Sequence, residues 1–386
     1  MPSGINLIAN PDGFRDRFLS LKTRRDVASL LEVDYSLFTY LLYRSDPNMR
    51  YRRFEIRKRS GGTRPIMAPN NSLRILQRKL ADVLNVVYRP RSSVRGFVLR
   101  RGILSNAKMH RRKRFVLNVD LTNFFASINL GRVRGMFMAV PYQLPTEVAT
   151  TLAQICCFSD QLPQGAPSSP IVSNMLCARM DSQLERLAKR FRCTYSRYAD
   201  DVTFSTSQSR FQEALGFLRT EGDKQVAEVG PELAGVITSN GFAINPNKVR
   251  LSKTGQHQEV TGLVVNRFPN VRRQVVRQVR AMIHALQKFG PEAAGTDHFS
   301  RYASPDRGAR FQQVSFQEVL YGKLAFVRAI KGKDNPVYVR LAQRLAELYS
   351  NVVAGEERTG VSLVENVETR RAARTQQPGG YAHAAG

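Results

Sequence analysis

The spacing of apolar residues along the chain predicts helices first and a β-hairpin after them. Residues 1–50 carry apolar side chains at helical spacing and are expected to form amphipathic helices. The spacing then becomes that of strands on either side of the glycine pair at residues 61–62, which predicts a hairpin. Helical spacing returns over residues 73–84, so a helix should follow this hairpin.

The middle of the chain combines strand-like and helix-like segments. Residues 115–119 form a largely apolar run typical of a buried strand, and residues 194–205 alternate as a second hairpin. Residues 173–190 and 211–218 have helical spacing. Antiparallel strands flanked by helices predict an α+β fold.

The last third of the chain is predicted to be mainly helical. Apolar positions over residues 275–279 and 341–348 have helical spacing. Between them, Gly, Pro and polar residues predict a loop over residues 291–312. From about residue 368 the chain is rich in Arg, Gln, Gly and Ala, a composition typical of a disordered tail.

The charge of the chain narrows the choice of partner. Of 386 residues, 59 are Lys or Arg and 31 are Asp or Glu, which gives a net charge of +28. A field of this sign attracts phosphate groups. The basic residues also gather ahead of Asp120, as in the run at residues 111–114, which favours nucleic-acid binding over a surface that is basic only for solubility. The length of 386 residues leaves room for two or three packed subdomains, and the 42% of hydrophobic residues permit a sizeable core.

The cysteines and the lengths of the apolar runs indicate the expected cellular compartment. Cys156, Cys157, Cys177 and Cys193 show no C-x-x-C spacing, so we expect reduced core residues of a cytosolic protein. The chain does not open with the basic and apolar segments of a secretory signal peptide. No apolar run approaches the roughly 18 residues of a membrane span, so none is expected.

Three aspartates are the candidate catalytic residues. Asp120 ends the apolar run at residues 115–119, and Asp200 and Asp201 follow in Tyr-x-Asp-Asp. Neighbouring strand residues point to opposite faces, so the last two acids can share a site only at a turn. Three carboxylates repel one another unless a hard divalent ion such as Mg²⁺ binds them. Two such ions about 3.5–4 Å apart would activate a hydroxyl and stabilise leaving pyrophosphate, as in a nucleic-acid polymerase. A plain acidic β-turn is the structural alternative.

Three further motifs stand in a fixed order around these acids. Residues 54–69 read Phe-x-Ile-x-Lys-x-x-Gly-Gly-x-Arg-x-Ile-x-x-Pro, residues 162–170 contain Gln-Gly and Ser-Pro, and residues 241–248 read Gly-Phe-x-Ile-Asn-x-x-Lys. Together with the aspartates they resemble the motifs of reverse transcriptases. Within that class the chain most resembles the bacterial retron reverse transcriptases, which are RNA-directed DNA polymerases. The resemblance extends from about residue 51 to residue 266.

The resemblance implies a right-hand polymerase fold, with fingers, a palm built on an antiparallel sheet backed by helices, and a helical thumb. The expected divisions are an N-terminal helical segment (1–50), fingers (51–114, with part of 129–165), palm (115–266), thumb (267–365) and a disordered tail (366–386).

The resemblance also assigns roles to the residues in these motifs. Asp120, Asp200 and Asp201 match the metal-binding aspartates. Lys58 and Arg64 match the cations that grip the incoming triphosphate.

Four more residues complete the implied active site. Phe125 falls where these enzymes place a ring that excludes a ribose 2′-hydroxyl, although a core role is the alternative for one member of the pair Phe124–Phe125. Gln164 and Gly165 would lie against template and nucleotide, because glycine permits close backbone approach. Lys248 would act as general acid toward pyrophosphate, with a solvated surface lysine as the alternative.

Two shorter motifs narrow the class to retrons. Residues 106–110 fit an N-A-x-x-H signature and residues 260–262 fit a V-T-G box. Asn106 and His110 are accordingly expected at the RNA interface, although a lone histidine is more often a structural hydrogen-bonding group. A basic segment in the expected thumb would hold RNA through shape and phosphate contacts. Its candidate residues are Arg272, Arg273, Arg277 and Arg280.

The resemblance also implies partners. The enzyme would bind its own structured non-coding RNA as template and primer, use dNTPs, and start from a guanosine 2′-hydroxyl to give a branched RNA–DNA hybrid. It would serve in phage defence with an effector protein in the bacterial cytoplasm. Nothing in the chain resembles an RNase H domain, so template removal would fall to a separate host enzyme.

Two other classes of function remain open. The chain could be a group II intron-like, diversity-generating or abortive-infection polymerase. It could also be a non-catalytic RNA-binding scaffold that holds an effector inactive. The presence of Asp120, Asp200 and Asp201 argues against the scaffold.

Overall fold

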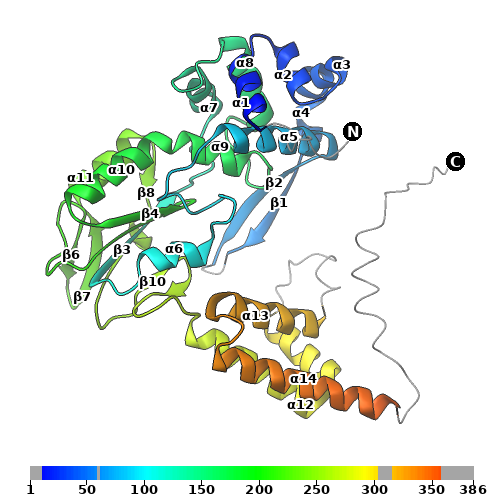
Figure 1. The fold of residues 1–386 in the computed structure, drawn as a ribbon, viewed down its shortest axis with the longest axis vertical. Coiled ribbons are helices and arrows are strands. Elements are labelled where there is room, and N and C mark those ends of the chain that lie inside the picture. Colours follow the sequence, from blue (N-terminus) through cyan, green and yellow to red (C-terminus); the bar gives the residue numbers. More distant parts are fainter. Residues whose placement is uncertain (1–10, 59–60, 303–314, 358–386) are drawn as a thin grey trace. The chain divides into compact units, whose positions relative to one another are not determined.

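The structure is a computed structural model that describes residues 11–58, 61–302 and 315–357. It divides into two compact units, Met1–Asn270 and Val271–Gly386 (Figure 1). The described residues of each unit bury apolar side chains of their own.

The described part of the N-terminal segment is helical, as predicted. Thr23 caps the second helix through a capping box with Asp26, an arrangement that stabilises a helix by about 1 kcal/mol. Phe14 and Phe18 bury their rings in the core of the first unit. The elements are α1 (Pro11–Leu19), α2 (Arg24–Leu30), α3 (Tyr35–Thr39), the π-helix η1 (Tyr40–Arg44) and α4 (Pro47–Arg50).

The predicted hairpin and the helix that follows it are both present. Strands β1 (Tyr51–Arg57) and β2 (Thr63–Pro69) pair antiparallel, from Tyr51 opposite Pro69 to Arg57 opposite Thr63. Most of β1 is exposed on both faces, so the hairpin projects from the body of the unit. Helix α5 (Asn71–Val87) then buries its apolar stripe in the core.

A five-stranded antiparallel sheet forms the centre of the first unit. Strand β3 (Phe115–Thr122) lies in the middle, and β5 (Asp201–Thr206) and β4 (Thr194–Tyr198) follow on one side. On its other side β3 pairs with two short strands, β8 (Ala243–Ile244) and β9 (Arg250–Lys253). The strand at residues 115–119 and the hairpin at residues 194–205 are therefore confirmed.

Helices cover both faces of this sheet. Helices α9, α10 and α11 lie on one face and α6 on the other (Figure 1). The alternation of β4 follows from this, since Ser196 bonds to α6 while Tyr195 and Arg197 bond to α10. The helices of this unit are α6 (Ile103–Met109), α7 (Leu130–Met138), α8 (Thr146–Cys156), α9 (Ser169–Leu176), α10 (Ala178–Arg190) and α11 (Pro231–Ser239). The helix predicted over residues 173–190 is thus two helices that meet at Cys177.

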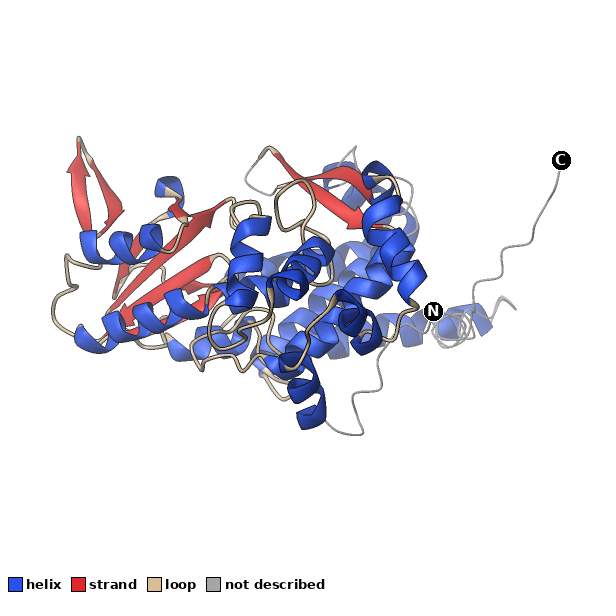
Figure 2. Ribbon diagram, turned by 90° about the horizontal axis from the view of Figure 1, so that it is seen from above, coloured by secondary structure: helices blue, strands red, loops and turns tan. Residues whose placement is uncertain are grey.

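The helix predicted over residues 211–218 is wrong. Residues 213–215 form a turn, after which β6 (Gly216–Glu221) and β7 (Lys224–Val229) form a hairpin. A two-residue turn joins these strands, with Gly222 at φ 57°, and a glycine–aspartate pair at this position is a strong hairpin signal. A third two-stranded antiparallel sheet pairs β10 (Glu259–Val260) with β11 (Leu263–Val264). Figure 2 shows the strands in red, with the β-hairpins separate from the central sheet.

The second unit contains three helices in its described residues: α12 (Arg273–Tyr302), α13 (Phe316–Lys331) and α14 (Pro336–Glu357). The loop predicted over residues 291–312 is wrong as far as Tyr302, because α12 continues beyond a kink at Gly290, whose φ is 75°. Pro291 opens the second part of this helix, where its missing N–H costs nothing. Residues 303–312 and the predicted tail lie outside the described residues.

Two other expectations can be compared with the structure. All four cysteines carry free thiols, three of them buried and Cys193 half-buried, as expected for reduced core residues. None of the helices in the described part of the chain combines the length and apolar character that a bilayer crossing requires.

Candidate active site

The central sheet brings Asp120 and Asp201 together. Asp120 on β3 stands directly opposite Asp201 on β5 in the antiparallel register. Opposite residues of such a pair point to the same face, with Cβ atoms about 4.5–5.5 Å apart. The backbone N–H of Leu121 donates to the carbonyl of Asp200 over 3.1 Å, which ties the same two chain segments together.

A tight turn allows the adjacent acids to share this site. Strand β4 ends at Tyr198 and β5 begins at Asp201, so Ala199 and Asp200 form the turn. Ala199 has a φ of 57°, in the left-handed region that residues with a Cβ rarely adopt. The prediction that the two aspartates require a turn is confirmed.

The acids influence one another electrostatically. Burial raises the pKa of Asp201 to about 7, and the charges of Asp200 and Asp120 contribute. Burial and the charge of Asp120 also raise the pKa of Asp200, while Lys248 and Arg64 oppose the change. Without a cation, the site therefore holds less than its full negative charge at neutral pH.

Lys248 and Asn245 bind Asp120. The Nζ atom of Lys248 lies 2.8 Å from Oδ2 of Asp120, and Nδ2 of Asn245 donates to Oδ1 over 3.3 Å. Lys248 belongs to the short 3-10 helix η2 (Pro246–Lys248), and its side chain is 51% exposed. Lys248 is therefore paired within the site and is not merely a solvated surface lysine, while Asn245 is a contact that the sequence interpretation did not assign.

The three carboxylates are ligands of the kind that a hard divalent cation prefers, but their side chains are not gathered around one point. Among the described residues, no group of three or more His, Cys, Asp or Glu side chains is arranged to hold a metal ion. The carboxylate of Asp120 instead pairs with Lys248. The chemistry still fits, because the three acids are oxygen donors whose mutual repulsion a cation would relieve.

The predicted nucleotide-binding residues lie on the hairpin and on the loop that supports it. The N–H of Met67 on β2 donates to the carbonyl of Gln164 over 2.8 Å. Gly165 has a φ of 118°, and a Cβ there would stand 2.9 Å from the carbonyl oxygen of Met67. Lys58 and Arg64 are both exposed on the hairpin, and the charge of Arg64 acts on the pKa of Asp200.

The two phenylalanines after β3 have different environments. Phe124 is 3% exposed and stacks on Phe242, with ring centroids 5.5 Å apart. Phe125 is only half-buried, and its ring lies 5.3 Å from that of Phe124 and 6.1 Å from that of Phe97. Phe124 is therefore the core member of the pair, and Phe125 is accessible.

The prediction that Asn106 and His110 contact RNA is wrong, since both side chains are fully buried. The two ring nitrogens of His110 lie 2.7 Å from the hydroxyls of Ser205 and Ser196, and Ser196 donates to Oδ1 of Asn106 over 2.6 Å. Burial lowers the pKa of His110 to about 3, so its ring is neutral at physiological pH. The N-A-x-x-H signature attaches α6 to the sheet, which is the structural role that a lone histidine more often has.

The predicted RNA-binding arginines lie in or next to α12 of the second unit. Arg273, Arg277 and Arg280 recur every three or four residues and are exposed, so they share one face of the helix. Arg272 is exposed immediately before the helix.

Arg197 and Gly96 lie against the turn and Asp181 binds Arg197, and all three residues were missed from the sequence. Arg197 stands in a buried strand immediately before the Tyr-x-Asp-Asp motif. A charged side chain at a buried strand position needs a partner, and this was the available signal. Its partner Asp181 is distant in sequence, which spacing could not reveal.

The known proteins to which this chain is similar are reverse transcriptases, in agreement with the arrangement of the three aspartates. Residues 56–266 match the family described as "Reverse transcriptase (RNA-dependent DNA polymerase)". The chain is 35% identical over 283 residues to the retron Mx65 reverse transcriptase of Myxococcus xanthus, covering 68% of this chain and 62% of that protein. It is 35% identical over 274 residues to the retron Mx162 reverse transcriptase of the same organism, covering 65% and 55%.

A third relative is covered more completely. The chain is 31% identical over 280 residues to the retron Ec86 reverse transcriptase of Escherichia coli, covering 71% of this chain and 82% of that protein. The chain thus spans about three fifths of the two myxobacterial relatives and four fifths of the Escherichia coli one. The family match also confirms the predicted right-hand polymerase fold. This chain belongs to the reverse transcriptase family and, within it, to the retron reverse transcriptases.

Proposed function

We propose that this protein is the RNA-directed DNA polymerase of a retron, which copies part of a structured non-coding RNA into DNA. The observation that carries the proposal is the placement of Asp120 opposite Asp201, with Asp200 in the adjoining turn and Lys248 bound to Asp120. Membership of the reverse transcriptase family supports RNA-dependent DNA synthesis as the reaction that this arrangement would catalyse.

The aspartates would hold two Mg²⁺ ions. When bound, such ions activate the attacking hydroxyl and neutralise charge on the leaving pyrophosphate. The raised pKa of Asp201 supports the proposal, since a bound cation would favour the ionised carboxylate that burial and the neighbouring acids disfavour. Lys248 is close enough to Asp120 to deliver a proton beside the reacting phosphates as general acid.

The residues around the acids would position the nucleotide. Lys58 and Arg64 would bind the triphosphate of a dNTP through charge-assisted contacts, and their exposure leaves them accessible. Phe125 would exclude a 2′-hydroxyl. Gln164 and Gly165 would support β2 and contact the template and nucleotide.

In this proposal the parts of the right hand follow the sequence divisions. The hairpin β1–β2 belongs to the fingers, the five-stranded sheet to the palm, and the second unit to the thumb. The boundary of the compact units lies at residues 270–271, four residues beyond the palm limit at residue 266. The exposed arginine face of α12 would hold RNA through its phosphates.

The biological part of the proposal rests on the retron relatives. The enzyme would start from a 2′-hydroxyl of its RNA and give a branched RNA–DNA hybrid. It would act in anti-phage defence with an effector protein in the cytoplasm, and a separate host RNase H would remove the template.

Primer extension on an RNA template tests the activity. The wild type should extend the primer with dNTPs and Mg²⁺, whereas Asp200→Asn combined with Asp201→Asn should bind the same RNA without making DNA. RNA binding by the wild type with no DNA product would leave the scaffold function in place of the polymerase.

A further inference from the structure

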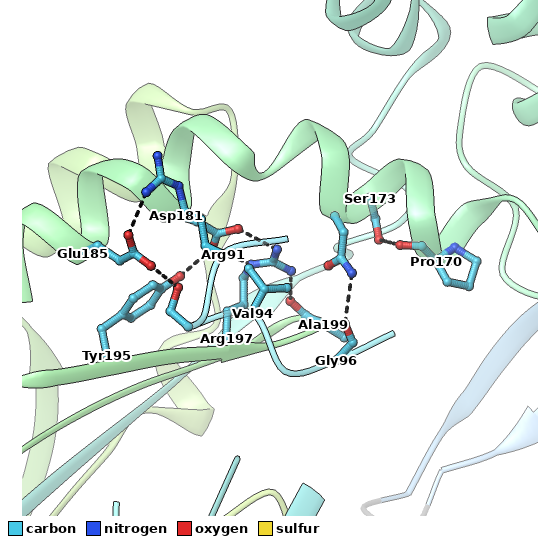
Figure 3. Close-up of polar contacts among 12 residues, drawn as sticks. Arg91, Val94, Gly96, Pro170, Ser173, Asp181, Glu185, Tyr195, Arg197 and Ala199 are labelled. Atoms are coloured by element: carbon cyan, nitrogen blue, oxygen red, sulfur yellow. Dashed lines mark hydrogen bonds and ion pairs between the residues drawn. The ribbon is translucent and has the colours of Figure 1, made fainter. Parts of the chain in front are cut away.

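A buried ion pair lies directly beside the catalytic turn. Arg197 on β4 is fully buried, and its Nε and Nη2 atoms donate to Oδ1 and Oδ2 of Asp181 on α10, each over 2.8 Å (Figure 3). Asp181 is also fully buried. The two parallel bonds form the fork-like arrangement that fixes a guanidinium in one orientation.

A tyrosine also binds the carboxylate of this ion pair. The hydroxyl of Tyr195 donates to Oδ1 of Asp181 over 2.6 Å. Burial is the largest single influence and lowers the pKa of Arg197, but the charge of Asp181, the hydrogen bond to it and the neighbouring Cys177 and Tyr195 together hold the pKa well above its usual value. Arg197 is therefore permanently charged and immobilised, although it lies away from solvent.

The remaining arm of the guanidinium reaches the catalytic turn. Nη1 of Arg197 donates to the carbonyl oxygen of Ala199 over 3.1 Å. Ala199 precedes Asp200 directly and has the left-handed φ of 57°. Such a conformation persists only where the surroundings enforce it. The hydrogen bond from Arg197 supplies one such constraint.

A loop holds the turn from a second direction. A Cβ on Gly96 would stand 2.5 Å from the backbone nitrogen of Ala199, so only glycine fits there. Nδ2 of Asn174 donates to the carbonyl of Gly96 over 2.9 Å. The backbone N–H of Arg197 donates to the carbonyl oxygen of Ser93, and the carbonyl oxygen of Arg197 accepts from the backbone N–H of Arg95. These two hydrogen bonds fix the loop along β4.

We infer that Arg197 is a positioning residue of the active centre, which sets the turn so that Asp200 and Asp201 can take up a divalent cation together with Asp120. The inference rests on the proposed function, because it presumes that these carboxylates bind the metal. Arg197 would not contact substrate or metal and would act only through the backbone of Ala199.

A purely structural role would not need a guanidinium. Replacing a buried ion pair with apolar side chains of similar volume is often neutral or stabilising, so packing is a weak reason for Arg197 and Asp181. An apolar side chain cannot donate to the carbonyl of Ala199. The donor at this position is thus the property that distinguishes positioning from packing.

Two variants separate these roles. Arg197→Lys keeps the positive charge but loses the fork. Asp181→Leu, Tyr195→Phe and Arg197→Met together replace the whole network with apolar side chains and leave no buried charge. Arg91→Met is the matched control, because Arg91 pairs with Glu185 on the same helix over 2.8 Å without reaching the turn.

The main measurement is metal binding without substrate. The thermal midpoint of each full-length variant is followed against Mg²⁺ and Mn²⁺ concentration, since a ligand that binds only the folded state raises it. We expect the half-saturating metal concentration to rise at least tenfold in both network variants and to stay within twofold of wild type in Arg91→Met. In primer extension, kcat should fall by a similar factor while KM for dNTP and the affinity for RNA change less than threefold.

The outcomes are distinct. Unchanged metal binding in Arg197→Lys, or in the apolar variant if it folds, would overturn the positioning role of Arg197, even if primer extension became slower. The proposal that the protein is a polymerase would still stand. A wild type whose stability does not respond to either metal would overturn the inference and the proposed metal site together. An equal loss in Arg91→Met would show that α10 acts by general packing, which also overturns the inference.

Discussion

Asp201 carries an electrostatic cost in the metal-free protein. Its pKa is raised to about 7 in the folded chain, against about 4 in an unfolded one. Over this interval the folded state binds more protons than the unfolded state, so stability is present at acidic pH and is lost as the pH rises toward 7. The acids are therefore retained at the expense of stability, as is common at functional sites.

Replacing Asp201 should consequently stabilise the protein without metal. In the presence of a chelator at pH 8, Asp201→Asn should raise the thermal midpoint by at least about 2 °C. The gain should vanish well below pH 4, where Asp201 is protonated in both states. Thermal unfolding followed by circular dichroism measures both effects. Asp223→Asn, at the exposed tip of the β6–β7 hairpin, is the control, and a gain independent of pH would refute the electrostatic explanation.

Phe125 should control the choice of sugar. In the proposed site, removing its half-buried ring would open space beside the nucleotide, so Phe125→Ala should improve use of ribonucleotides relative to deoxynucleotides at least about tenfold, or ~1.4 kcal/mol. The measurement is the ratio of kcat/KM for the two sugars. Phe124→Ala removes a core ring and should cost about 3–5 kcal/mol of stability with little effect on this ratio. Unchanged selectivity in Phe125→Ala would remove the sugar-gate role.

At the scale of elements, the sequence predicted those segments that have a local signal. The glycine pair at residues 61–62 and the alternation at residues 194–205 identify their hairpins. The helix predicted over residues 211–218 was wrong because a few apolar residues can have helical spacing by coincidence. The signal for the hairpin that is present there was the turn at Gly222. At residues 291–302, glycine and proline mark a kink between two helical segments and not a loop.

The loop at residues 93–96 could not have been predicted, since its role arises from distant contacts. Gly96→Ala should force the catalytic turn to shift, because the added Cβ would meet the backbone nitrogen of Ala199 at 2.5 Å. We expect primer extension to fall more than about tenfold, with RNA binding retained. Gly102→Ala is the matched control, since no heavy atom lies within 4 Å of its Cβ position. Full activity in Gly96→Ala would show that the turn tolerates displacement.

At the scale of the whole molecule, a net charge of +28 makes RNA affinity depend on salt. The charge indicated a nucleic-acid partner, but it could not tell exposed arginines such as Arg277 from the buried Arg197. The same limit explains the error over Asn106 and His110, whose motif supports the fold from the interior.

The arginine face of α12 should contribute through phosphate contacts. Arg277→Ala combined with Arg280→Ala should weaken RNA binding and reduce the slope of log affinity against log salt by about one to two. Titration of RNA at several salt concentrations gives the slope. Lys333→Ala, an exposed position between α13 and α14, controls for charge alone. A slope unchanged in the double variant would place the RNA elsewhere.

The most direct test of the central claim is the identity of the nucleic acid that co-purifies with the protein. Sequencing should find DNA joined to the RNA that templated it in the wild type, and the same RNA without DNA in Asp200→Asn combined with Asp201→Asn. RNA without DNA in both proteins would contradict polymerase function, and intron RNA in place of a branched hybrid would contradict the retron assignment.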